Sequence, residues 1–252
     1  MTIKEVFPNP TVKQVIFQIC FPNLFFMENK IGEFQIKIMD EFPESALLFR
    51  KQLVFTDLGP KSKMEEMTAG LNEDTGNKIW QFKSPKKIEL NVLSNSLDIN
   101  SQFHKTYKNP GSPHKFRDII EFVLEIFFKV TGIPLIHRIG LRYIDECPIP
   151  AKSSEAFLKF YNTSFPLKRF NLEDAEEMEF KTVIKKDSYS IRYGEVLKKV
   201  NDNYKLQLDF DGFAVNIKAF DYLAVTDALH DLIANEFERT IKEPVYDYMR
   251  NP

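Results

Sequence analysis

Apolar residues alternate with polar ones in many short runs, and this pattern predicts β-strands with one buried face. The first run covers residues 12–21, where every second side chain from Val15 to Phe21 is apolar. Similar runs predict strands over residues 46–55, 79–84, 87–93, 96–103, 135–145, 178–186, 189–196, 204–210 and 213–220. The chain is therefore expected to be rich in antiparallel strands.

Helical spacing of apolar residues appears in four other segments, which cover residues 27–42, 113–131, 154–161 and 221–242. The second is apolar nearly all round and is expected to be central, with Ser112 as its cap and Gly132 at its end. Pro244 is expected to close the last helix. Asp211-Gly212 predicts a tight turn between the last two strands, and the polar stretch 57–78 predicts a mobile loop or hairpin tip.

The order strand, helix, several strands, long helix occurs twice along the chain. We therefore expect an α+β fold with two helix-backed antiparallel sheets, which join through the first strand of each half. The halves would be residues 1–132 and 133–252, and together they would form one compact unit. An antiparallel sheet can leave one face in water, so the face opposite the helices is expected to be open to a partner.

The composition predicts a large hydrophobic core and argues against several classes of function. The 252 residues include 24 Phe and only 9 Gly, and the formal net charge is −2, so no global field attracts nucleic acid or anionic lipid. Cys20 and Cys147 are expected to be buried free thiols, as in a reducing compartment. The chain shows neither a secretory signal at its N-terminus nor a membrane-length apolar run, and we expect a cytoplasmic protein.

Local motifs for cofactors, metals and nucleophiles are missing. The chain has no glycine-rich phosphate loop, no dinucleotide fingerprint and no serine elbow. Its two cysteines and four histidines are not spaced as metal ligands. We therefore expect no cofactor and no metal site.

The central segment, residues 137–145, concentrates unusual chemistry. Strand alternation places Ile139, Leu141 and Tyr143 on one face, and Arg138, Gly140 and Arg142 on the other. The two guanidiniums would either converge on an anion that approaches the backbone at Gly140, or pair with acidic residues of neighbouring strands. The candidate ligand- or partner-binding residues are Arg138, Arg142, Tyr143 and His137.

Two further patterns have alternative interpretations. Basic residues and tyrosines interleave between Lys181 and Lys199, which suits either a nucleic-acid surface or a solvated sheet face. His230 lies beside the apolar stripe of the last helix and is expected to be a packed or interface histidine. His137, Asp145 and Glu146 would be the acid–base groups of an enzyme whose site is assembled from distant residues.

Three segments carry a resemblance that spans nearly the whole chain: residues 9–17, the motif Gly140-Leu-Arg-Tyr-Ile-Asp145, and residues 229–241. In them the chain resembles a family of sporadically distributed, uncharacterised prokaryotic proteins of similar length, with Asn or Asp at the last motif position. The resemblance supplies no catalytic residues. The patchy distribution of this family is similar to that of accessory genes in defence or toxin–antitoxin systems.

Together these observations favour a non-enzymatic binding or regulatory protein, an accessory of such a system. The alternatives are a nucleic-acid or nucleotide binder that uses a basic sheet face, and an enzyme with a dispersed site. A protein partner or self-association as a homo-oligomer is expected, and membrane association is not.

Overall fold

One antiparallel sheet organises the protein. The structure is a computed structural model, and it describes residues 5–49, 78–149, 153–200 and 203–251. In these residues nine strands lie in the order β2-β3-β4-β5-β1-β6-β9-β8-β7. Their bounds are β1 Val12–Cys20, β2 Glu44–Phe49, β3 Lys78–Ser84, β4 Ile88–Val92, β5 Ser96–Ser101, β6 Leu135–Cys147, β7 Glu177–Lys186, β8 Tyr189–Val200 and β9 Asn203–Lys218.

The centre of the sheet is the pair β1 and β6, the first strands of the two predicted halves. Phe17 faces Leu141 and Ile19 faces Ile139 across this antiparallel pair, and all four side chains are buried. The expected α+β class with antiparallel strands is confirmed. The first strands of the two halves, β1 and β6, pair as we expected, and through them the described strands form one continuous sheet. A duplicated origin of the halves stays a prediction.

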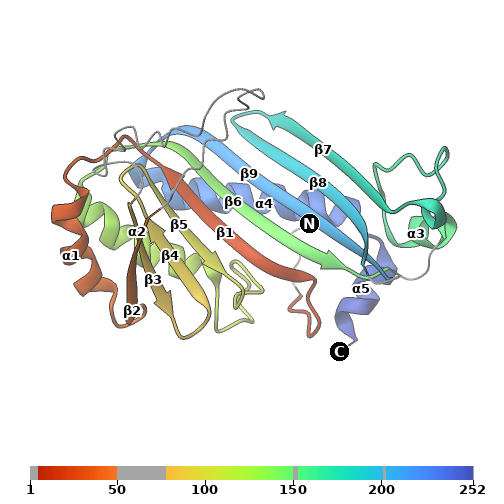
Figure 1. The fold of residues 1–252 in the computed structure, drawn as a ribbon, viewed down its shortest axis with the longest axis horizontal. Helices are drawn as coiled ribbons and strands as arrows, with labels where there is room; N and C mark the ends of the chain where they lie inside the picture. Colours follow the sequence, from red (N-terminus) through yellow and green to blue (C-terminus); the bar gives the residue numbers. More distant parts are fainter. Residues whose placement is uncertain (1–4, 50–77, 150–152, 201–202, 252) are drawn as a thin grey trace, which may run out of the picture.

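The long helices cover one face of this sheet (Figure 1). The helices are α1 Met27–Ile38, α2 Phe116–Thr131, α3 Ser154–Phe160, α4 Tyr222–Thr240 and α5 Glu243–Arg250. Phe127 of α2 packs against Phe21 and Phe34, with ring centroids 5.4 and 5.5 Å apart. Phe237 of α4 packs edge-on against Phe210 of β9 at 5.9 Å. Phenylalanine rings thus pack the helices against one another and against the sheet.

Of three helix ends predicted from the sequence, one is confirmed and two are wrong, each for a local reason. The second helix begins at Phe116, after Lys115, since Ser112 bonds to the backbone of His114 in a turn and does not cap the helix. Gly132 ends it in the left-handed conformation, with φ of 68°, as predicted. Pro244 does not end the helical region. It lies in the first turn of a further helix, α5, where a missing N–H costs nothing.

The expected turn at Asp211-Gly212 is wrong, because β9 runs straight through it. Gly212 pairs with Leu141 on one side and Ile191 on the other. A Cβ atom built on Gly212 would lie 3.1 Å from Cδ1 of Ile233 on α4. The glycine is thus explained by the close approach of α4 to the sheet, and not by a turn.

The remaining expectations concern cysteines, membrane helices and one long loop. Both cysteines are free, with Cys147 buried and Cys20 partly buried. Within the described ranges, no helix combines the length and the apolar character that a bilayer crossing requires. The predicted loop at 57–78 falls almost entirely outside the described residues, as does the second half of the strand expected at 46–55.

Candidate functional site

The two arginines of the central motif lie on the sheet face opposite the helices, and each pairs with an aspartate. Arg138 Nη2 lies 3.0 Å from both carboxylate oxygens of Asp211. Arg142 Nε donates to Asp209 Oδ1 at 2.8 Å. Both aspartates belong to the neighbouring strand β9, so these ion pairs cross-link β6 to β9. This arrangement is the sheet-holding alternative that the sequence left open.

Gly140 gives room to Arg138 itself. A Cβ atom at Gly140 would lie 2.7 Å from Arg138 Nη1 and 3.1 Å from its Cζ. The guanidinium therefore lies across the glycine, with its Cζ 5.0 Å from the centre of the Phe213 ring. The space that we assigned to an approaching anion is filled by the side chain two residues earlier.

The other predicted basic residues are also paired or dispersed. Lys181 pairs with Glu179, and Lys198 pairs with Glu177 at 2.9 Å. Arg192 lies 3.4 Å from Asp211. His137 is exposed on β6, whereas Tyr143 is buried on the helix side of the same strand. The four candidate residues of the central segment are therefore divided between the two faces.

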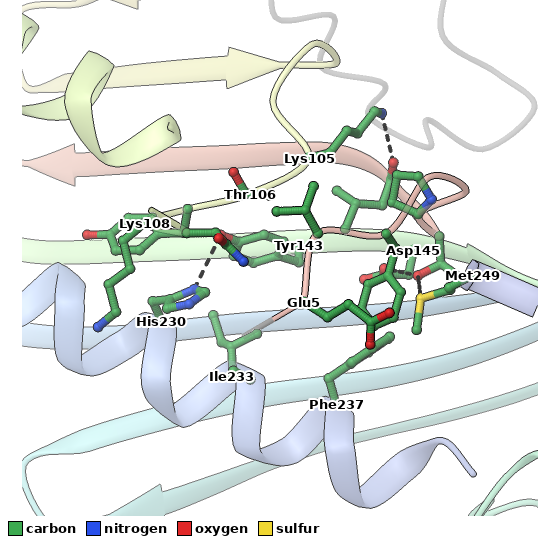
Figure 2. A pocket seen from close by; sticks show the side chains of 18 of the residues that line it. Glu5, Lys105, Thr106, Lys108, Tyr143, Asp145, His230, Ile233, Phe237 and Met249 are labelled. Carbon is green, nitrogen blue, oxygen red and sulfur yellow. Dashed lines mark hydrogen bonds between the residues drawn. The ribbon is translucent and has the colours of Figure 1, made fainter. Parts of the chain in front are cut away.

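A cavity of about 480 Å³ lies on the helix side of the sheet. Figure 2 shows its side chains converging from β6, α4, α5, the N-terminal segment and the loop that precedes α2. Most of the wall is apolar, and it includes Val6, Phe7, Val12, Phe210, Ile233, Ala234, Phe237 and Met249. Cavities of this size and lining are typical of small-molecule sites.

Asp145 is the most buried acidic group that lines this cavity. Alternation along β6 places it on the buried face with Leu141 and Tyr143, and only 2% of it is exposed. Thr11 Oγ1 donates to its Oδ1 at 2.7 Å. Burial raises the pKa of Asp145 to about 6, against the lowering effects of the Thr11 hydrogen bond and the Lys105 charge.

A second polar group consists of Tyr143, His230 and Tyr107. Tyr143 Oη lies 3.4 Å from His230 Nδ1, and the imidazole stacks on the Tyr107 ring at 4.5 Å. Tyr107 donates to Asp227 of α4 at 2.9 Å, and Arg117 of α2 bonds to the same carboxylate at 3.0 Å. Burial lowers the pKa of His230 to about 4, so the imidazole is neutral at pH 7. The expected packing of this histidine is confirmed.

The two ends of the described chain build one wall together. The backbone N–H of Asn9 donates to the carbonyl of Met249 at 3.0 Å. Phe7 packs on Tyr246, and Glu5 pairs with Arg250 at 3.3 Å. Segments more than 230 residues apart in sequence thus close the cavity beside β6.

Sequence reasoning placed Asp145 among candidate acid–base groups but missed the cavity around it. The available signal was a carboxylate on the apolar face of a predicted strand. Lys105, Tyr107 and Phe237 carried no such signal, because nothing local links them to Asp145. Among the described residues, no group of three or more metal-ligating side chains comes together.

Comparison of the chain with models of protein families, with curated proteins and with solved structures gives no match. The function is therefore inferred from the cavity and its residues.

Proposed function

We propose that this chain is a non-enzymatic binding protein whose ligand is a small, mainly apolar molecule held in the cavity between α4 and β6. The observation that carries the proposal is the cavity itself, of about 480 Å³, with an apolar wall and a few converging polar groups. Apolar contact would supply most of the affinity, and the polar groups would orient the ligand.

The charge pattern supports this cavity over the open sheet face. Arg138, Arg142 and Arg192 have their charges offset by Asp209 and Asp211 within the same chain. A nucleic-acid surface would instead present cations without such partners. A regulatory role in defence or in a toxin–antitoxin system, and association with a second copy, rest on the sequence alone.

Filling the cavity tests the proposal. Ala234 of α4 lines the cavity, and Ala234→Phe would place a ring where the ligand lies. With the uncharged fluorescent probe N-phenyl-1-naphthylamine, we expect saturable binding to the natural protein and at least about tenfold weaker binding to this variant. A fluorescence titration measures both.

The matched control is Ala224→Phe, the same change on the same helix at an exposed position. This variant is expected to bind the probe as the natural protein does. Equal binding by all three proteins, or a signal that never saturates, would show that the probe does not occupy the cavity and would remove the support for a small-molecule site.

A further inference from the structure

The cavity holds a carboxylate whose hydrogen bonding is incomplete. Asp145 is 98% buried, and its Oδ1 is occupied by Thr11 Oγ1 at 2.7 Å. In the described part of the chain, neither a side chain nor the backbone donates a hydrogen bond to the other oxygen, Oδ2. A buried carboxylate is costly without hydrogen-bond donors or a countercharge. A ligand group that donates to this oxygen would therefore gain binding free energy.

Among the described residues, the cation whose charge acts on this carboxylate does not form an ion pair with it. Lys105 is close enough for its charge to act on Asp145. Its ammonium group, however, donates to the backbone carbonyl of Val12 at 2.8 Å (Figure 2). Lys105 is thus held at an exposed position, where it leaves Oδ2 of Asp145 without a direct countercharge.

The surroundings of Asp145 favour a ligand group that is small, cationic and attached to an apolar body. Phe237 and Met249 offer it apolar contact, and Tyr143 follows on the same face of β6. Two other charged side chains on the wall have partners of their own: Glu5 pairs with Arg250, and Lys108 pairs with Asp231 at 2.8 Å. An anionic ligand would meet the buried carboxylate and be repelled.

We infer that the ligand is an amphiphilic amine, whose protonated nitrogen pairs with Asp145 while its hydrocarbon part lies against α4. This inference rests on the proposed function, because it names the chemical class of the molecule that the same cavity would hold. An ammonium group can donate to Oδ2 without disturbing the bond from Thr11.

Three probes of equal chain length separate the charge from the hydrocarbon. At about pH 8, where Asp145 is ionised given a pKa of about 6, calorimetric titration is carried out with n-octylamine, 1-octanol and octanoate. We expect the amine to bind at least about tenfold more tightly than the alcohol, and octanoate to bind most weakly.

The variant Asp145→Asn keeps the shape and an acceptor for Thr11 but removes the charge. In this variant we expect the preference for the amine over the alcohol to be lost. Saturable binding of octanol, together with a cooperative urea-unfolding curve, reports that the variant is folded around an intact cavity.

The outcomes distinguish failure of the proposed small-molecule site from failure of the assignment of an amine as its ligand. If none of the three probes binds, or if Ala234→Phe affects none of them, the proposed function fails. If octanol or octanoate binds the natural protein as tightly as octylamine does, or if Asp145→Asn keeps the preference for the amine, the cavity stands as a binding site and the assignment of an amine is overturned.

Discussion

Replacing Gly212 by Val is expected to destabilise the folded protein by about 3 kcal/mol, the largest stability effect that we expect from a single substitution here. A Cβ atom at this position lies 3.1 and 3.2 Å from two carbons of Ile233, and 3.6 Å from the carbonyl oxygen of Leu229. Ile233 could yield to a single methyl group, but the backbone of α4 cannot yield to an isopropyl group without leaving the sheet. Urea-induced unfolding measures the change.

The control is Gly194 on the neighbouring strand β8. A Cβ atom there has its nearest neighbour at 3.6 Å, which is ordinary contact, so Gly194→Val is expected to cost less than about 1 kcal/mol. Combining Gly212→Val with Ile233→Ala should recover part of the loss, because the shorter side chain frees the space. Similar losses from the two valine variants, or no coupling to Ile233, would contradict the packing account of Gly212.

Replacing Asp145 by Asn is expected to stabilise the protein by about 2 kcal/mol at about pH 8 and to change little at about pH 4. Burial raises the pKa of this carboxyl from an ordinary value near 3.8 to about 6 in the folded state. The folded protein therefore holds the proton more tightly than the unfolded chain does. Stability contributed by the protonated form is lost as the pH rises through this window, and the amide avoids the loss.

The measurement is the difference in unfolding free energy between the variant and the natural protein, followed from about pH 4 to about pH 8. His104 and His230, whose pKa values burial lowers to about 4, titrate in both proteins, so their effects largely cancel in the difference. Glu146→Gln, which removes a carboxylate from the adjacent exposed residue of β6, is the matched control for the loss of one negative charge. If the difference in unfolding free energy between the two proteins does not depend on pH, burial does not raise the pKa of Asp145.

A residue that weakens the fold in its ionised form is typical of a binding site, where stability is given up for a charge placed in advance. Asp145→Asn would thus have opposite effects on stability and on amine binding. Loss of both together would instead indicate a purely structural role for this carboxylate.

Much of the fold could be predicted from residue alternation, because burial on one face imposes a period of two on each strand. The pattern in Val15, Phe17 and Ile19 gave β1 almost to its ends. The Asp211-Gly212 pair led to a wrong prediction of a turn. A glycine that lets a helix pack closely against a strand has the same local sequence as a glycine that allows a turn. Only the position of Ile233 in space distinguishes them, and no local pattern contains that information.

The site was predicted only in part, for a similar reason. The alternation that placed Tyr143 on the apolar face of β6 also places Asp145 there, and this much was available from the sequence. The partners Thr11, Lys105 and His230 come from three other segments, and the fold alone brings them to β6. The arginines attracted attention because they are conspicuous in sequence, but Asp209 and Asp211 pair with them in the sheet.

The contact between Asn9 and Met249 has a consequence for synthesis on the ribosome. Residues 5–12 leave the ribosome before α5 does, so the pocket cannot close until translation has passed position 250. A nascent chain would have no ligand affinity until that moment. A bound ligand would therefore stabilise only those molecules in which residues 5–12 and α5 have met.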